Sequence, residues 1–183
     1  MEGKPIKIIL IGIQGAGKST QGNLLRDTLG IPYLSTGHIF REMAKEKTPI
    51  GRYIKETMNA GFLIPDNKTL EIVESYLSRP EYAKGYIMDG FPRTTAQAKT
   101  FKNGITRVIY LKVSDREALW RLAYRNEVGR KDETLQAILK RIELFHKFTE
   151  PVIDYYREKG LLREIDGEKS IEEIHKEIMS YIK

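Results

Sequence analysis

The sequence contains no cysteine, only three histidines and a single tryptophan. Without cysteine, the chain has no disulfides, thiolate nucleophiles or cysteine-bound metals. His38, His146 and His175 are far apart and lack the spacing of a metal site, so we expect no structural zinc. The chemistry of this chain must therefore come from its charged and hydroxyl-bearing side chains and from its backbone.

The sequence also lacks long apolar runs, internal repeats and low-complexity tracts. No apolar run approaches the ~20 residues that a transmembrane helix needs. The polar start leads straight into a strand-like run and does not resemble a signal peptide. We therefore expect a cytoplasmic protein without a membrane partner, and its 183 residues favour a single domain with one core.

Positive charge is in excess, with 31 Lys and Arg against 25 Asp and Glu, a formal net charge of +6. Such a balance is typical of proteins that bind nucleic acid, an acidic membrane surface or a polyanionic small ligand. It is equally typical of a solvated surface rich in Lys and Glu. Charge alone leaves these interpretations open.

Strand-like and helix-like segments alternate along the chain. Apolar, β-branched runs predict strands at 7–13, 32–35, 85–88, 107–113 and 161–165. Amphipathic patterns predict helices at 21–29, 38–45, 49–59, 67–77, 116–125, 133–148 and 171–182, and Thr149 is a candidate N-cap for a helix restarted by Pro151. This alternation predicts an α/β fold of three layers, a five-stranded parallel sheet with helices on both faces.

A glycine-rich segment follows the first predicted strand. Residues 12–19, GIQGAGKS, match G-x-x-x-x-G-K-[ST], and a helix is expected to begin inside the match. The backbone N–H groups of Gly15, Ala16 and Gly17 can face phosphate oxygens. Lys18 can reach the β- and γ-phosphates, and Ser19 can contact Mg²⁺, with Thr20 as a second candidate. The motif predicts a P-loop of the NTPase type and no more than that.

Three further stretches carry chemistry: 34–41 (LSTGHIFR), 60–66 (AGFLIPD) and 85–97 (GYIMDGFPRTTAQ). The planar guanidinium groups of Arg41 and Arg93 match the geometry of phosphate. Asp89 ends a strand, as a magnesium-binding aspartate beside a P-loop does. Gln97 offers a donor and an acceptor to a base edge. Taken singly, such arginines are also common surface ion-pair partners, and Asp-Gly before proline is a common turn.

These stretches, in this order behind a P-loop, resemble the adenylate kinase family over roughly residues 5–183. The resemblance implies reversible transfer of the terminal phosphoryl group of Mg-ATP to AMP, which gives two ADP. It implies one P-loop kinase domain, 1–183, with an acceptor-nucleotide subregion at about 35–66 and a short lid at about 125–132. The lid holds no Cys or His cluster, so the zinc of long-lid relatives is not expected.

The same resemblance implies roles for individual residues. Thr36 and Gln97 would bind the adenine of AMP, and Asp89 would act on Mg²⁺ through its water shell. The full set expected at the acceptor nucleotide is Thr36, Gly37, Arg41, Phe62, Leu63, Ile64, Gly90, Phe91, Pro92, Arg93, Gln97, Arg130 and Arg141. On the ATP side the resemblance adds Arg121, Arg125 and Lys169 to the P-loop residues. The residues expected at the moving phosphoryl group are Lys18, Arg93, Arg125, Arg130 and Arg141.

Alternatives remain on the sequence. UMP/CMP-type kinases share this pattern but typically carry Ala and Asn where this chain has Thr36 and Gln97. His38 replaces an acidic residue common in the family, which leaves acceptor identity open. A regulatory P-loop protein that contacts RNA is another reading, although RNA recognition favours exposed aromatics among basic residues. We expect a monomer that binds small nucleotides and no nucleic acid.

Overall fold

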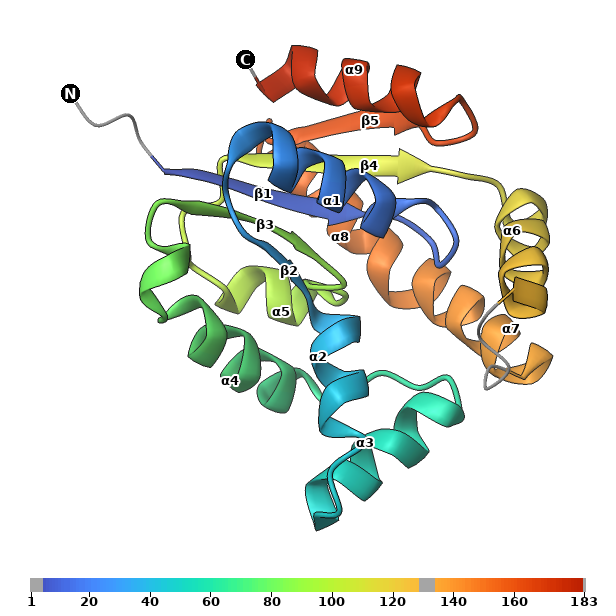
Figure 1. The fold of residues 1–183 in the computed structure, drawn as a ribbon. Coiled ribbons are helices and arrows are strands. Elements are labelled where there is room, and N and C mark those ends of the chain that lie inside the picture. Colours follow the sequence, from blue (N-terminus) through green and yellow to red (C-terminus); the bar gives the residue numbers. More distant parts are fainter. Residues whose placement is uncertain (1–4, 129–133, 183) are drawn as a thin grey trace.

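The computed structural model of the chain describes residues 5–128 and 134–182. Strands and helices alternate along it (Figure 1). The strands are β1 (Ile6–Ile11), β2 (Tyr33–Ser35), β3 (Gly85–Asp89), β4 (Arg107–Lys112) and β5 (Leu162–Asp166). The helices are α1 (Lys18–Leu29), α2 (Thr36–Met43), α3 (Pro49–Asn59), α4 (Asp66–Leu77), α5 (Thr95–Thr100), α6 (Asp115–Val128), α7 (Leu135–Leu144), α8 (Glu150–Glu158) and α9 (Ile171–Ile182). A 3₁₀ turn, η1, spans Pro80–Tyr82, and a π-helical turn, η2, spans Phe145–Thr149.

The strands of the described residues form one five-stranded sheet in the order β2-β3-β1-β4-β5. Every pairing in it is parallel. Helices α1 and α9 lie on one face of the sheet, and α5 and α8 lie on the other (Figure 1). The fold class predicted from the sequence, three layers around a five-stranded parallel sheet, is therefore confirmed.

Burial explains why the central strands are so apolar. All five residues of β3 are buried, as are Ile8, Ile9, Leu10 and Ile11 of β1. A strand covered by helices on both faces has no solvent side, so it reads as a continuous apolar run. Burying each such side chain contributes about 1.5–3 kcal/mol, which fixes the ends of β1 and β3 firmly in the core.

One prediction about the helices was wrong. The sequence predicts a break after residue 148, with Thr149 as the N-cap of a new helix. In the structure, α7 runs through η2 into α8, and Thr149 has helical angles (φ −94°, ψ −31°). The wider turn accommodates the missing N–H of Pro151 without ending the helix. The Thr149 hydroxyl instead donates to the carbonyl oxygen of Arg93 at 2.9 Å.

Helices α2 and α3 extend away from the sheet (Figure 1). They enclose a second, smaller hydrophobic cluster, built on buried Phe40, Ile54 and Ile64. Thr48 caps α3 through a hydrogen bond from the N–H of Gly51 to its hydroxyl, and Pro49 follows at the first helical position. This part of the chain therefore has a small hydrophobic cluster of its own, which adjoins the main core through Met43 and Ile72.

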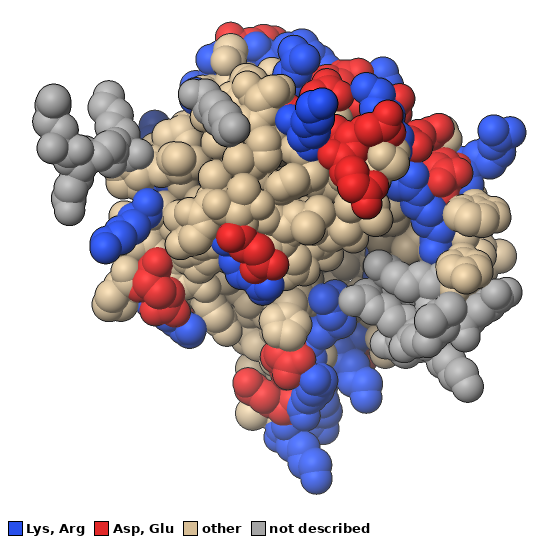
Figure 2. Space-filling model, turned by 45° about the horizontal axis from the view of Figure 1, so that its top comes forward, with Lys and Arg blue, Asp and Glu red and all other residues tan. Residues whose placement is uncertain are grey.

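The charged surface is mixed in sign. Figure 2 shows Lys and Arg side chains interleaved with Asp and Glu over the face in view. Many of these charges pair locally, for example Lys112 with Glu164 at 2.9 Å and Lys68 with Glu71 at 3.1 Å. No helix within the described residues is long and apolar enough to cross a membrane.

Candidate active site

A cleft of about 910 Å³ opens where the parallel strands end. The ends of three strands and the segments after them contribute to its wall: the loop after β1, Ser35 and Gly37 at the end of β2, and Asp89 to Arg93 at the end of β3. In a parallel sheet these carboxyl ends meet at one edge, which is the common place for a ligand in such folds. One cavity therefore collects motifs that lie far apart in the sequence.

The loop between β1 and α1 is shaped by glycine. Gly15 and Gly17 both have φ of 91°, a region that other residues rarely adopt. A Cβ on Gly15 would lie 2.9 Å from the carbonyl oxygen of Ala118, so α6 packs directly against the loop. Gly17 also forms the N-terminal end of α1, where backbone N–H groups and the helix dipole favour an anion.

Lys18 folds back over this loop. Its Nζ donates to the carbonyl oxygens of Gly12 at 2.7 Å and Ile13 at 3.0 Å. The ammonium thus lies above the same cradle that the loop N–H groups form. A positive charge and several donors face one part of the cleft, which suits the phosphates of a nucleotide.

The helix that follows β4 supplies a second positive group. The guanidinium of Arg121 lines the cleft, and its Nε donates to Oε1 of Glu117 one turn earlier, at 2.7 Å. Lys169 also lines the cleft, from the loop between β5 and α9, and its Nζ pairs with Glu177 at 3.1 Å. Both groups are held by local ion pairs at the end of the cleft away from β3.

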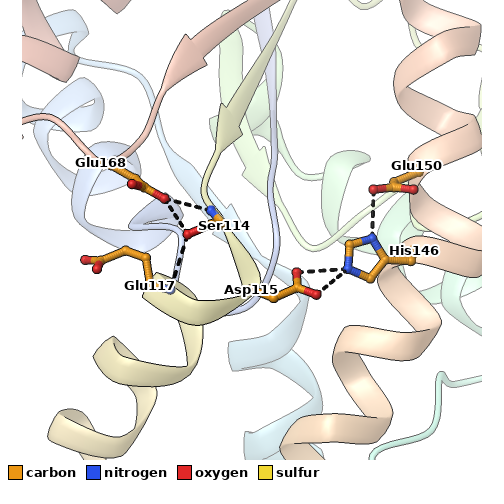
Figure 3. Close-up of polar contacts among 6 residues, drawn as sticks. All are labelled: Ser114, Asp115, Glu117, His146, Glu150 and Glu168. Carbon is orange, nitrogen blue, oxygen red and sulfur yellow. Dashed lines mark hydrogen bonds and ion pairs between the residues drawn. The ribbon is translucent and has the colours of Figure 1, made fainter.

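Polar contacts tie the β5–α9 loop to α6 (Figure 3). Oε1 of Glu168 accepts from the N–H of Ser114 at 2.8 Å and from its hydroxyl at 2.7 Å. The same hydroxyl accepts from the N–H of Glu117 at 3.3 Å, which caps the helix. These bonds lower the pKa of Glu168, and the nearby charges of Arg121 and Arg116 lower it further. The loop and α6 therefore form one connected wall.

A histidine joins the start of α6 to the α7–α8 helix (Figure 3). Nε2 of His146, in η2, lies 2.9 Å from the carboxylate of Asp115, and its Nδ1 lies 2.7 Å from Glu150. The hydrogen bond with Glu150 raises the pKa of His146 above its usual value, and Asp115 raises it further. Two carboxylates thus favour the charged imidazolium at this junction.

The aspartate that ends β3 is buried and held by a tyrosine. Oδ2 of Asp89 accepts from the hydroxyl of Tyr33 at 2.6 Å. Burial, and then the charge of Asp89, raise the pKa of Tyr33, and the Ser19 hydroxyl also interacts with Tyr33. A Cβ on Gly22 would lie 2.5 Å from the Tyr33 ring, so the glycine inside α1 makes room for it.

The oxygens of Ser19 and Asp89 suit a magnesium ion. Both residues line the cleft, and both approach Tyr33 from different elements. Hydroxyl and carboxylate oxygens are hard ligands of the kind that Mg²⁺ prefers. Within the described residues there is no cluster of three His, Cys, Asp or Glu that would form a closed metal site. A Mg²⁺ here would take few protein ligands and share the phosphate oxygens of a nucleotide.

Three arginines converge on the other half of the cleft. The side chains of Arg41, Arg93 and Arg141 all line it. Burial lowers the pKa of Arg93, and repulsion from Arg141 and Arg41 adds to this, while Asp89 opposes it. An arginine stays charged in proteins, so an anion bound between these groups would relieve their mutual repulsion. Nε of Arg93 is fixed by donation to the Gly90 carbonyl at 2.8 Å.

Arg141 connects separate parts of the wall. Its Nη2 donates to the carbonyl oxygen of Met58, near the end of α3, at 2.8 Å. Its Nη1 lies 3.3 Å from Oε1 of Gln14 in the loop after β1. One guanidinium therefore links α7 to both the loop after β1 and the end of α3.

Gln97 belongs to a small buried network. Its Oε1 accepts from the backbone N–H of Arg93 at 2.7 Å, and its Nε2 donates to Oδ1 of Asp66 at 2.8 Å. The other oxygen of Asp66 accepts from the Thr94 hydroxyl at 2.9 Å. The amide also lines the cleft, so its position is set before any ligand reaches it.

Comparison with known proteins agrees with this arrangement. The family described as adenylate kinase matches residues 10–161 of the chain. An adenylate kinase of Azobacteroides pseudotrichonymphae is 37% identical and covers 97% of each chain. One of Cyanothece sp. is 36% identical, covering 96% of this chain and 94% of its own. One of Clostridium botulinum is 35% identical over 92% and 94% respectively.

The chain belongs to the adenylate kinase family. This confirms the resemblance that the P-loop and the three later stretches predict. The matches to the relatives extend over most of each protein, so the family assignment applies to the whole cleft and not to the P-loop alone.

Most of the adenylate kinase residues predicted from the sequence meet in the cleft. On the P-loop side the residues that line it are Gly15, Ala16, Gly17, Lys18, Ser19, Thr20, Arg121 and Lys169. On the other side they are Gly37, Arg41, Phe62, Leu63, Ile64, Asp89, Gly90, Phe91, Pro92, Arg93, Gln97 and Arg141.

Thr36 does not line the cleft. It is buried behind the cleft wall, and its hydroxyl donates to the Asp89 carbonyl at 3.3 Å. Arg130 lies outside the described residues. Arg125 lies in α6, but its side chain is outside the described part of the chain. The expected roles of these residues stay predictions.

Sequence reasoning missed several members of this adenylate kinase site. Tyr33, Asp66 and Glu168 make the bonds that hold Asp89, Gln97 and the β5–α9 loop. Tyr33 stands beside Asp89 because β2 and β3 pair with Ser35 opposite Asp89, a register that no motif records. Of these three, only Asp66 carries a recognisable sequence signal, because it is an acidic residue at the start of a predicted helix.

Proposed function

We propose that this protein is an adenylate kinase, which moves the terminal phosphoryl group of ATP to AMP in a reversible reaction that yields two ADP. Its membership of the adenylate kinase family supports this activity. The single observation that carries the proposal is one cleft lined by both a P-loop and three convergent arginines. A donor and an acceptor phosphate can therefore meet inside one cavity.

The P-loop side binds the donor. The N–H groups at Gly15 to Gly17 and the ammonium of Lys18 hold the phosphates of ATP. Ser19 and Asp89 would hold Mg²⁺ on this side, Asp89 through its water shell. Magnesium supplies charge neutralisation of the donor phosphates when it is bound. The chain's own share is to orient these phosphates toward the arginines.

The arginine side binds the acceptor. Arg41 and Arg93 grip the phosphate of AMP, and Arg141 reaches between the two nucleotides. Arg125 and Arg130 join them at the moving phosphoryl group. The attacking oxygen of AMP is already ionised at neutral pH, so the reaction needs positioning and charge neutralisation and no general base.

Base recognition on the acceptor side rests on Thr36, Gln97 and the segment Phe62 to Ile64. The fixed amide of Gln97 presents a polar edge to adenine, and the apolar side chains cover its faces. The hydroxyl of Thr36 holds the backbone at Asp89, so its effect on the base passes through the cleft wall. His38 leaves a UMP/CMP-type acceptor as the alternative.

The chain works as one domain with two moving parts. The segment at about 35–66, which has its own hydrophobic cluster, closes over AMP. A short lid at about 125–132 closes over ATP, and its residues 129–132 lie outside the described part. Closure excludes water, which would otherwise hydrolyse ATP. We further propose a cytoplasmic monomer.

An acceptor panel tests the proposal. Mg-ATP is offered with AMP, UMP, CMP, GMP or dTMP, and ADP release is followed. We expect release that depends on AMP and exceeds that with every other acceptor. Release that is greatest with UMP or CMP would support the pyrimidine kinase, and release that needs no acceptor would support a regulatory ATPase.

A Thr36→Ala variant tests whether Thr36 contributes to the preference for AMP. We expect its preference for AMP over CMP and UMP to fall, because the wall that places Gln97 and Asp89 loosens. The ratio of kcat/KM values for AMP and CMP measures this. An unchanged ratio would remove Thr36 from base recognition while the panel on the parent enzyme still decides the activity.

A further inference from the structure

Two large aromatic side chains stand exposed on α6. Trp120 and Tyr124 keep 63% and 61% of their surface in solvent, while Ala118 and Leu122 of the same helix are buried. The two rings lie one helical turn apart and stack nearly parallel, with centroids 6.0 Å apart and 11° between planes. They are not core residues, and the stack holds the indole in one orientation.

The indole lies at the donor end of the cleft. Trp120 lines it together with Glu117 and Arg121, and the β5–α9 loop that carries Lys169 lines the same cavity. Glu168 binds this loop to the start of α6, so the loop and the helix form adjoining walls (Figure 3). A nucleotide whose phosphates occupy the P-loop would carry its base toward this end.

The chemistry beside Trp120 favours a flat, uncharged ring. The face of an indole carries a negative quadrupole, and the carboxylate of Glu117 is close by, so a second phosphate is disfavoured there. The guanidinium of Arg121 is tied to Glu117 at 2.7 Å and offers a second flat surface. Flat aromatic side chains such as Trp120 and planar guanidinium groups such as Arg121 both stack on nucleobases.

We propose that Trp120, braced by Tyr124, stacks on the base of the donor nucleotide and sets the preference for a purine donor. This inference rests on the proposed function, since it takes ATP as the donor held by the P-loop. The purine offers a larger face than a pyrimidine, so the indole favours ATP over CTP.

Fluorescence tests the contact directly. Trp120 is the single tryptophan of the sequence, so the tryptophan emission of the whole enzyme reports this position. We expect ATP without AMP to quench or shift the emission in a saturable way. Inorganic tripolyphosphate, which fills the P-loop without a base, and AMP at acceptor-saturating concentration should leave it unchanged. An ATP titration without any change, or an equal response to tripolyphosphate, would overturn the proposal.

Kinetics test the consequence. We expect Trp120→Leu to raise the KM for ATP about five- to tenfold, while kcat and the KM for AMP stay within roughly twofold. Trp120→Phe should keep a KM for ATP close to that of the parent. The KM of Tyr124→Leu should lie between those of the parent and Trp120→Leu. Phe148→Leu, which removes an exposed aromatic ring outside the cleft wall, is the matched control and should match the parent. Equal losses for ATP and CTP in Trp120→Leu would contradict the purine preference.

The two proposals fail in different ways. If the parent enzyme forms no ADP from ATP and AMP, the proposed activity fails whatever the emission shows. If it forms ADP but neither the emission nor the KM for ATP depends on Trp120, the stacking proposal alone fails.

Discussion

The proposed donor half and the proposed acceptor half of the cleft are built from different parts of the chain. The donor cradle is backbone: one continuous segment between β1 and α1, bent by Gly15 and Gly17 and covered by Lys18. The acceptor half is side chain, with groups such as Asp66 and Gln97 that come from separate segments and are bonded to one another. A backbone cradle depends on a few glycines and one lysine, whereas a side-chain network depends on each of its members.

The largest effect should come from the donor half. We expect Lys18→Met to lower kcat for ADP formation by at least about a thousandfold, because it removes the charge that the transferring phosphoryl group needs. The midpoint of thermal unfolding should change little. Steady-state assays and circular dichroism measure the two. Lys99→Met, an exposed lysine on α5, serves as the control and should match the parent.

The acceptor half should respond in a graded way. We expect Arg93→Ala to reduce kcat/KM for AMP by about a hundred- to a thousandfold, through loss of a bidentate phosphate contact. Arg93→Lys should recover only part, because an ammonium cannot keep the Gly90 bond and also offer a planar fork. Arg79→Ala, outside the cleft, is the control. If Arg93→Lys kept the full kcat/KM for AMP, positive charge alone would suffice at this position. The contrast between a backbone cradle and a side-chain network would then fail.

The difference between one contiguous loop and side chains from separate segments determines how much of the site the sequence predicts. The cradle is contiguous, so residues 12–19 predict it completely, and the apolar runs of β1 and β3 predict the sheet. The acceptor arginines are found by resemblance, but their bonds to Gly90, Met58 and Gln14 depend on tertiary packing. Helix α5 was missed since its six residues are too few for a periodic pattern.

The boundary between the halves can be tested at Gly22. We expect Gly22→Ala to destabilise the fold by about 1–3 kcal/mol, because its Cβ would meet the Tyr33 ring, although alanine favours a helix elsewhere. Chemical denaturation measures the free energy of unfolding. The double variant Gly22→Ala/Tyr33→Leu should remove the clash and be less destabilised than the two single changes add up to. A Gly22→Ala protein more stable than the parent would disprove the close approach.

The smallest expected effect concerns His146, which joins the start of α6 to the α7–α8 helix on the donor side of the cleft. The folded pKa of His146 is raised, so its pairing with Asp115 and Glu150 stabilises the fold fully below pH 6.5. This stabilisation is lost as the pH rises through the folded pKa. Because the pair is well exposed, we expect at most about 1 kcal/mol, or about 2–4 °C in Tm.

Melting curves between acidic and mildly alkaline pH test this. The difference in Tm between the parent and His146→Gln should be largest at low pH and shrink as the pH rises above 6.5. His175→Gln controls for the general loss of a histidine. A difference that grows with pH would contradict the sign of the pairing.

The π-helical turn η2 has a mechanical consequence. Because it joins α7 and α8 without a break, residues 135–158 act as one stiff strut about 36 Å long. Along this helix, Arg141 bonds to α3, His146 to the start of α6, and Thr149 to the backbone at Arg93. A shift of this helix along its axis would therefore move all three contacts at once. One continuous helix therefore joins the donor wall to the acceptor wall, and a shift along its axis would strain the contacts on both sides.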